Sequence, residues 1–489
     1  MKSLTTFFAA SLLATHAWAQ DSALVVAFDT EPPGLDPTTN VSTATSASTW
    51  MNIYEGLTAY EDDGSISPSL AASWDIEGAK VYTFKLQEGV TFHDGSTFDA
   101  EDVKFSLDRA RAEDSTNPKK PNFNKIETVE VIDPLTVKVT LKTPSNLFLY
   151  YLAEPSAAMI ASETAETNAG TPVGTGPFKF VSWNRGDRIE FERYDAYWTE
   201  TPVTMDTVSI RYFGNSNSMG AALRAGDIDY MPAVNTLEMV KDFGSDDRFE
   251  VRVGQTQGVL SIVLNNEVEA LGDKRVREAI YHALDWRGIN EVAHSGLGTP
   301  RGTHMTPVNP YYVDTAVEDR YDLEQAQALL QEAGYGDGFD MTFKVLPQPT
   351  LVRTAELAAA MLSAINIRVR IETLELAQWL DVVFKNESYD ATVLTQQESW
   401  AFLTYADPTR FYNYDSATFQ ALVKEGEEAP NEDVAFEKMA EAQKFLADDM
   451  PSIWLYGVPN VSIADAKLTG IRTNLPVPAY PFAEISRTE

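Results

Sequence analysis

The chain has 489 residues, no cysteine and a formal net charge of −34. The lack of cysteine excludes disulfides, thiolate metal sites, a cysteine nucleophile and a lipid anchor on an N-terminal cysteine. The acidic charge argues against nucleic acid or an anionic membrane as partner, because binding phosphate needs a basic face. The length and the 44% hydrophobic content predict a globular protein of two or three domains.

The first 19 residues are predicted to be a secretory signal peptide. Lys2 supplies a positive charge, residues 4–13 form a short apolar run, and residues 17–19 are an A-x-A cleavage site. The run is shorter than the roughly 20 residues that span a bilayer, and no later stretch is long and apolar enough. We therefore expect a periplasmic mature protein that begins at Gln20, without a lipid anchor and without stable membrane insertion.

Hydrophobic periodicity predicts strands and helices that alternate along the chain, which indicates an α/β fold. Strands are expected at residues 81–86, 137–141, 189–193, 367–371 and 391–394. Helices are expected after the capping residues Asp99, Asp273 and Asp322, with apolar stripes that reach Ala110, Leu284 and Ala333, and at residues 354–365.

Short sequence motifs are spread along the chain, and each of them occurs once. They are LAASW (70–74), YTFKL (82–86), GVTFHDG (89–95), FDAEDV (98–103), LDP (35–37), IYEGL (53–57), PVGTGPF (172–178), LRAGDID (223–229), RVREAI (275–280) and the segment 321–335. In order and spacing the chain resembles the extracellular solute-binding proteins of the peptide, nickel and opine class (family 5). The resemblance covers nearly the whole mature chain.

The resemblance implies a periplasmic-binding-protein-like fold (type II, cluster C), with two hinged lobes and an extra α+β domain. Domain I would comprise residues 20–55, 175–265 and 470–489, domain II residues 56–174, and domain III residues 266–469. The implied function is the periplasmic substrate-binding component of an ABC import system. Such a protein would capture a small solute, expected to be peptide-like, in the cleft between domains I and III by hinge closure.

Two of the motifs are interpreted as structural. Residues 174–177 (GTGP) predict a turn in which the glycines supply positive φ and the proline fixes the exit. The segment lacks the strand, the G-K-[ST] and the helix of a phosphate loop. His93, beside Asp94 and Gly95, is predicted to be a hydrogen-bonded turn residue rather than a metal ligand.

The main candidate ligand-binding residues follow the strand at 391–394. Trp400, Phe402 and Tyr405 offer aromatic contact area, and Thr404 and Asp407 offer polar groups. The alternative is an aromatic cluster packed under domain III.

The position of Thr404 leaves the type of solute open. In the peptide-binding relatives, an Asp at this position, three residues before the acidic residue of the Asp-Pro pair, binds the peptide α-ammonium. The hydroxyl of Thr404 cannot neutralise an ammonium. Either another acid such as Glu398 replaces that Asp, or the solute is an oligosaccharide, an opine or a sugar conjugate without a free α-amine.

Further candidates lie at strand ends near the expected hinge. Thr30 and Glu31 precede the LDP motif, where a domain I strand ends near the cleft in the relatives. Gln255, Gln257 and Asn265 flank the strand that enters domain III, and amides both donate and accept hydrogen bonds. The alternative for each is a satisfied hydrogen-bonding group at the hinge.

Other functions find less support in the sequence. No G-x-S-x-G and no H-E-x-x-H is present, so we expect a protein that is not an enzyme and has no cofactor. A metal-chelate carrier with His294 or His304 as ligand, and a chaperone-like binder of unfolded peptides, remain alternatives. The expected partners are a small molecule or peptide and the ABC permease subunits, with the binding protein itself a monomer.

Overall fold

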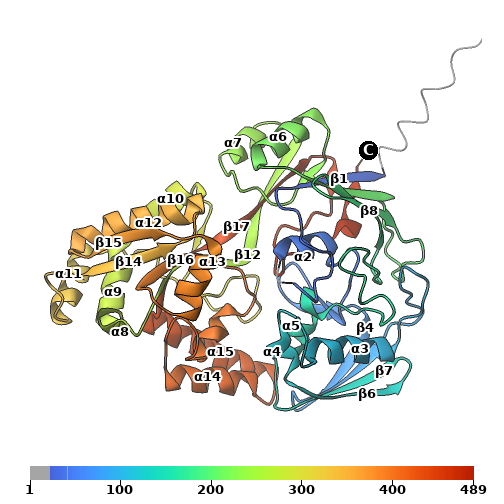
Figure 1. Cartoon of the computed structure of the whole chain (residues 1–489), viewed down its shortest axis with the longest axis horizontal. Coiled ribbons are helices and arrows are strands. Elements are labelled where there is room, and N and C mark those ends of the chain that lie inside the picture. The colour runs from blue at the N-terminus through green and yellow to red at the C-terminus, as the bar shows by residue number, and fades with distance from the viewer. Residues whose placement is uncertain (1–21, 41, 489) are drawn as a thin grey trace, which may run out of the picture.

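Two long strands, β12 (Phe249–Leu264) and β17 (Ser452–Asp465), run side by side through the middle of the molecule (Figure 1). They are neighbours in an eleven-stranded sheet within the computed structural model, which describes residues 22–40 and 42–488. In spatial order the sheet contains β15 (Arg368–Thr373), β14 (Asp340–Val345), β16 (Ala391–Gln396), β12, β17, β11 (Tyr230–Met231), β1 (Ala23–Phe28), β10 (Thr207–Tyr212), β9 (Arg188–Arg193) and β8 (Phe178–Asn184), and β13 (Thr299–Pro300) pairs with β17.

We call β12 and β17 the crossing strands, because the sheet continues through them from one lobe to the other. The first lobe comprises the described residues up to 248, and the second lobe comprises residues 265–451. The C-terminal segment after β17 returns to the first lobe, where the Phe482 amide donates to Asn52 Oδ1 at 3.0 Å and Arg487 pairs with Asp229 at 2.9 Å.

The first lobe contains a second, four-stranded antiparallel sheet. Its strands are β4 (Ala71–Glu77), β5 (Val81–Leu86), β7 (Thr136–Leu141) and β6 (Ile126–Asp133), beside the pair β2 (Thr58–Tyr60) and β3 (Ile66–Pro68). Helix α3 (Ala100–Arg111) packs against this sheet and begins at a capping box formed by Asp99 and Asp102. The other helices of the lobe are α2 (Thr43–Thr49), α4 (Lys120–Phe123), α5 (Phe148–Leu152), α6 (Ser216–Ala225) and α7 (Met239–Gly244).

In the second lobe, helices surround the strands β14, β15 and β16. Its helices are α8 (Glu269–Gly272), α9 (Lys274–Ala283), α10 (Trp286–His294), α11 (Leu323–Glu332), α12 (Pro349–Leu362), α13 (Leu376–Trp379), α14 (Ala417–Glu427) and α15 (Glu432–Asp449). Figure 1 places α14 and α15 below the sheet, close to α4 and α5 of the first lobe. Lys125 and Glu427 form an ion pair of 3.0 Å across this contact.

The predicted elements are present with small shifts, and the α/β class is confirmed. Asp99, Asp273 and Asp322 each accept a backbone amide at a helix start, as the sequence predicts. The helix predicted from residue 354 begins five residues earlier, because Pro349 occupies the first helical position, where its fixed φ suits a helix start. The expected signal peptide lies outside the described residues.

The crossing strands belong to two different cores along their length. Leu260 and Ile262 of β12 are fully buried in the core of the second lobe, whereas Ile463 of β17 is buried with Ala27 in a core of the first lobe. Between these regions the pairing shifts register between Gln255 and Val259. Such an irregularity interrupts the ladder and lets the strands bend locally.

The GTGP segment contradicts the predicted positive φ of its glycines and agrees with the predicted hydrogen-bonded role of His93. Neither Gly174 nor Gly176 has a positive φ, so that prediction was wrong. These glycines are needed for close approach, since a Cβ on Gly174 would lie 1.9 Å from the carbonyl oxygen of Ile53. His93 is bonded within this turn, with its Nδ1 accepting from the Gly174 amide at 3.3 Å and its Nε2 donating to the Gly176 carbonyl at 2.9 Å.

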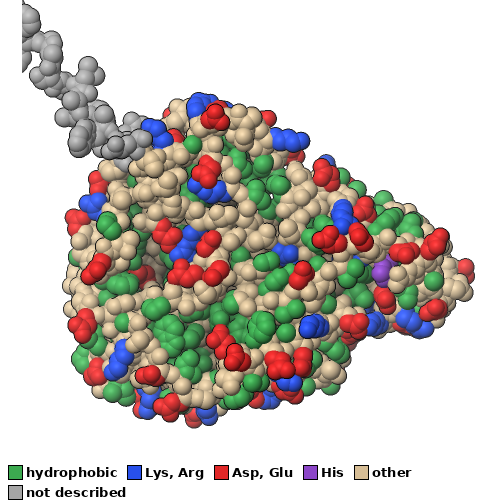
Figure 2. Space-filling model, turned by 180° about the vertical axis from the view of Figure 1, so that it is seen from behind, with side chains coloured by type: hydrophobic (Ala, Val, Ile, Leu, Met, Phe, Trp, Pro, Cys, Tyr) green, Lys and Arg blue, Asp and Glu red, His purple; other side chains and the backbone are tan. Residues whose placement is uncertain are grey.

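On the rear face of the molecule the acidic side chains are dispersed (Figure 2). On the rear face, acidic side chains lie in many small groups and basic ones lie beside several of them (Figure 2). This distribution agrees with a role in solubility rather than with one strongly charged binding face.

Gly174→Ala should lower the free energy of unfolding by about 2–3 kcal/mol, because a methyl group cannot fit against backbone atoms without shifting them. Urea unfolding of the two proteins measures the difference. Gly170→Ala is the matched control, since a Cβ there meets nothing within 4 Å and should change stability by less than about 0.5 kcal/mol. Equal effects of the two substitutions would contradict the close-approach explanation.

Candidate functional site

A cavity of about 300 Å³ lies where the two lobes and the crossing strands meet. We call it the interlobe cavity. Its lining comes from the end of β1 (Phe28, Asp29, Thr30), α2 (Thr43, Ala44, Ala47), the loop 233–235, the crossing strands (Thr256, Gln257, Val458–Val461), Gln397 of the second lobe, and the C-terminal segment (Leu475–Pro478, Tyr480). Its size is at the lower end of small-molecule sites. Because both lobes contribute, movement of one lobe would change its shape.

Two predicted residues, Thr30 and Gln257, line this cavity. Thr30 is exposed at the end of β1, and its hydroxyl donates to Asp29 Oδ1 at 3.1 Å. Gln257 is buried beside the register shift, where its Oε1 accepts from the Thr306 hydroxyl at 3.2 Å and its Nε2 donates weakly to the Val308 carbonyl at 3.4 Å. A ligand role for Thr30 and Gln257 stays a prediction.

The other three strand-end candidates are engaged in the fold. Gln255 Oε1 accepts from Arg301 Nη2 at 2.8 Å. Glu31 accepts from Trp183 Nε1 at 2.8 Å and from the backbone amide of residue 186. Asn265 donates to the carbonyls of residues 387 and 389. These bonds are those of the alternative stated from the sequence, a satisfied hydrogen-bonding group, and a ligand role for the three residues stays a prediction.

The aromatic loop after β16 is packed rather than open. Trp400 is 7% exposed and lies edge-on to Tyr150 of the first lobe and Tyr311 of the second, at 5.3 and 5.6 Å between ring centroids. Phe402 is fully buried, and Tyr405 stacks on Tyr412 at 4.2 Å. These rings are absent from the lining of the interlobe cavity as the described residues form it.

The two polar residues of the loop also have partners within it. Thr404 lies 2.9 Å from the hydroxyl of Tyr412, and Asp407 is exposed and accepts from the amide and hydroxyl of Thr409 at 3.0 and 2.6 Å. The packed aromatic cluster, which was the alternative interpretation of the sequence, accounts for what this loop does here. A ligand role for Trp400, Phe402, Thr404, Tyr405 and Asp407 stays a prediction.

Sequence reasoning missed several lining residues, above all Asp29, Asn235 and Tyr480. Asp29 directly precedes the predicted Thr30, so the strand-end argument that selected Thr30 would also have reached it. Asn235 and Tyr480 lie some 200 and 450 residues further along the chain, and only the fold brings them to β1. Asn235 Nδ2 donates to Asp29 Oδ2 at 2.6 Å.

The two histidines considered as metal ligands are held by protein groups. His294 Nδ1 lies 2.9 Å from the Tyr456 hydroxyl, and His304 Nε2 lies 3.1 Å from the Gln396 carbonyl. Burial lowers the pKa of each to about 4. Among the residues that the structure describes, no three His, Asp or Glu side chains gather in a way that could hold a metal ion.

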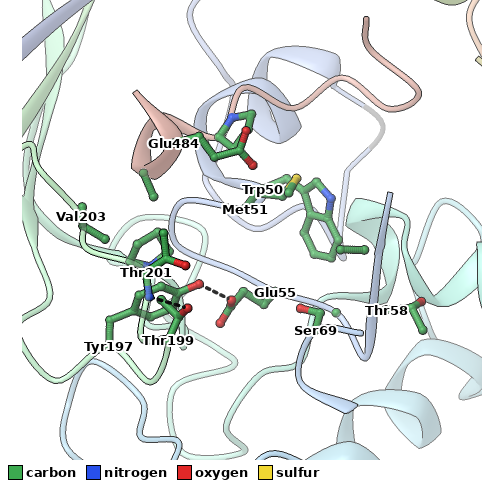
Figure 3. A pocket seen from close by; sticks show the side chains of 15 residues that line it. Trp50, Met51, Glu55, Thr58, Ser69, Tyr197, Thr199, Thr201, Val203 and Glu484 are labelled. Atoms are coloured by element: carbon green, nitrogen blue, oxygen red, sulfur yellow. Dashed lines mark hydrogen bonds between the residues drawn. The ribbon is translucent and has the colours of Figure 1, made fainter. Parts of the chain in front are cut away.

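A second cavity, of about 210 Å³, lies within the first lobe and the C-terminal segment (Figure 3). Glu55 faces it with a buried carboxyl group that accepts from Tyr197 at 2.8 Å, Thr175 at 2.8 Å and Trp198 Nε1 at 3.1 Å. Burial raises the pKa of Glu55 to about 7. No residue of the second lobe lines this cavity as described, so it is less suited than the interlobe cavity to report lobe movement.

Of the helices in the described ranges, none has both the length and the apolar composition required to cross a membrane.

Trp400→Ala should lower the free energy of unfolding by about 3 kcal/mol, because it leaves a cavity between Tyr150 and Tyr311. Thermal melting measures the loss, and Leu376→Ala is the control, since Leu376 is 58% exposed on α13. The buried Nε1 of Trp400 has no hydrogen-bond partner among the described residues, which is the feature that favours a ligand role. An unchanged melting temperature together with lost solute affinity would support that role and contradict the packing interpretation.

Glu55→Gln should remove part of the pH dependence of stability. The folded protein holds the Glu55 proton up to about pH 7, whereas the unfolded chain loses it near the ordinary value of 4.5. The free energy of unfolding therefore falls as pH rises from 4.5 to 7, by at most about 1.4 kcal/mol per pH unit from this group, and is constant above.

Urea unfolding between pH 5 and 8 measures this slope. The Gln variant should show a shallower slope than the wild type, while Glu101→Gln, at an exposed carboxylate, should leave it unchanged. Equal slopes in wild type and Glu55→Gln would contradict the raised pKa.

Comparison with known proteins agrees with this geometry. The family model of the bacterial extracellular solute-binding proteins, family 5, matches residues 65–421. The glutathione-binding protein GsiB of Pectobacterium atrosepticum is 31% identical over 379 residues, which cover 76% of this chain and 72% of that protein.

Solved structures show the same fold. The periplasmic binding protein DppA of Helicobacter pylori, in complex with the peptide STSA, has a TM-score of 0.80 and 25% identity, covering 96% of this chain and 98% of that one. AgaA of Agrobacterium tumefaciens, in complex with agropinic acid, has a TM-score of 0.77 and 24% identity, and the match covers 96% of this chain and 99% of AgaA. The periplasmic-binding-protein fold expected from the sequence is thereby confirmed, and the chain belongs to the bacterial extracellular solute-binding proteins of family 5.

Proposed function

We propose that this chain is the periplasmic substrate-binding component of an ABC import system, which captures a small peptide-like solute between its two lobes and delivers it to the permease. The observation that carries this proposal is the interlobe cavity, because its lining combines the end of β1, both crossing strands and Gln397 of the second lobe. A solute seated there would touch both lobes at once.

Closure is proposed to occur by bending of the crossing strands. The register shift between Gln255 and Val259 lies between the two cores, and Pro459 of β17, opposite Gln255, has no N–H to give to the ladder. A solute that contacts both lobes stabilises the closed arrangement by its differential affinity for the two arrangements. The proposed domains I, II and III keep the limits given above, with the crossing strands shared between I and III.

A peptide-like solute fits the polar groups of the cavity. Asn235, Gln257, Gln397 and Asn460 can each donate and accept, as a peptide backbone requires. The relatives named for glutathione and for the peptide STSA support the same class. We expect the solute to be released unchanged, since the role is transport rather than catalysis.

The proposed location follows from the N-terminal residues and from the family. Cleavage after Ala19 would release a mature protein without a lipid anchor, and the cavity is completed within one chain, which suits a monomer. Mass spectrometry of the exported protein and light scattering measure the two properties.

Solute binding should raise the melting temperature and shrink the molecule. At 100 times its Kd, a solute adds roughly 2.7 kcal/mol to stability, which thermal shift detects in a screen of short peptides, opines and oligosaccharides. Small-angle scattering should show a smaller radius of gyration with the same solute. A solute that stabilises the protein without changing its scattering would contradict hinge closure.

A further inference from the structure

One carboxylate gives the interlobe cavity its electrostatic character. Asp29 is the only charged side chain among the lining residues that the structure describes, and no Lys, Arg or His lines the cavity with it. The remaining polar lining is neutral, made of amides and hydroxyls. A solute that enters meets one fixed negative charge and no fixed positive charge.

The Asp29 carboxylate has neutral partners only. It accepts from Asn235 Nδ2 at 2.6 Å and from the Thr30 hydroxyl at 3.1 Å, and within the described chain no basic nitrogen lies in ion-pair range of it. A carboxylate has about four acceptor positions, so half of its capacity is unused. Glu31, two residues further on, differs because Trp183 and the backbone of residue 186 engage it in the fold.

Two aromatic rings share the lining of the cavity with this carboxylate. Phe28 directly precedes Asp29, and its ring meets that of Tyr480 at 5.5 Å in an edge-on arrangement. The charge of Asp29 contributes to raising the pKa of the Tyr480 hydroxyl, after burial, so the negative potential reaches the second ring. A carboxylate beside aromatic rings suits an ammonium group, through a charge-assisted hydrogen bond and cation–π attraction.

We propose that Asp29 binds a protonated primary amine of the solute, and that the interlobe cavity thereby selects solutes with a free ammonium group. This inference rests on the proposed solute capture and deepens it. The Asp29 carboxylate supplies the negative charge that Thr404 cannot give to a solute ammonium, and it does so from the first lobe instead of the second. It also disfavours solutes with a net negative charge, because no cation is present among the lining residues that the structure describes.

The experiment uses two matched pairs that differ in the amine alone. Trialanine is compared with N-acetyl-trialanine, and the glucosamine trimer with its fully N-acetylated form, by calorimetry at pH 7 with wild type, Asp29→Asn and Asp407→Asn. We expect the amine member to bind at least about tenfold more tightly than its acetylated partner in wild type and in Asp407→Asn. In Asp29→Asn this preference should fall to less than about threefold.

Asp29→Asn keeps an acceptor oxygen for Asn235 and Thr30, and Asp407 is an exposed carboxylate outside the cavity lining. A second measurement needs no variant. Wild-type affinity for trialanine should fall about tenfold between pH 7 and 9, as the α-amine with a pKa near 8 loses its proton, while binding of any acetylated partner stays level.

The outcomes distinguish the role of Asp29 in amine binding from the proposal of a peptide-like solute. Amine preference in the sugar pair alone supports Asp29 and contradicts a peptide-like solute. Equal binding of amine and acetylated members by wild type, or a preference that survives Asp29→Asn, overturns the role of Asp29. Loss of the preference in Asp407→Asn alone would move the amine site to the aromatic loop, and failure of all four probes to bind would overturn both proposals.

Discussion

The pairing of β12 with β17 is the interaction on which the rest of the molecule depends. These strands hold the two lobes in one sheet. β17 is buried at one end in the core of the second lobe and at the other in a core of the first, and β12 is buried in the second lobe and packs against the first through partly buried residues. Their ladder shifts register between Gln255 and Val259 and again between Leu260 and Ser261. The first shift lies between the two cores and is a place where the strands can bend. The cavity lies beside that point, which ties its shape to the bend.

Contacts between the lobes occur on two sides of this hinge and differ in chemistry. Far from the crossing strands, Lys125 pairs with Glu427 and Tyr150 packs against Trp400, so ion pairing and aromatic contact hold α14 and the aromatic loop against the first lobe. At the interlobe cavity the facing groups are amides, hydroxyls and one carboxylate. The first set stabilises the approach of the lobes without a solute, and the second leaves polar groups for a solute to satisfy.

Two carboxyl groups, those of Glu55 and Asp29, illustrate how the environment of an acidic residue differs between the two cavities. Glu55 is deeply buried, which raises its pKa to about 7 although three hydrogen-bond donors act in the opposite direction, and its bonds join segments of the first lobe. Asp29 is partly exposed, has two neutral partners and faces the cavity. Composition counts both as acidic residues, yet only the second presents charge to an entering molecule.

The sequence by itself determined the class of fold and most of its elements, because helix caps, apolar stripes and strand alternation are local. Asp99, Asp273 and Asp322 begin helices as expected, and the motifs predict the family that the match to the family model confirms. Within the candidate site, local reasoning reached Thr30 and Gln257, which lie at a strand end and in a crossing strand.

The set of polar side chains that share the cavity depends on contacts between residues that lie far apart in the sequence. Asn235 and Tyr480 meet Asp29 through sheet order and the return of the C-terminal segment, and neither carries a local mark of this role. Aromatic residues have the same appearance in the sequence whether they pack or bind, and only the fold shows that Trp400 and Tyr405 are buried. The glycine and proline pattern of GTGP predicts a turn with positive φ, whereas in the structure the glycines allow the backbone of Ile53 to approach closely. Ile53 lies 121 residues before Gly174, and no local pattern encodes such a long-range contact.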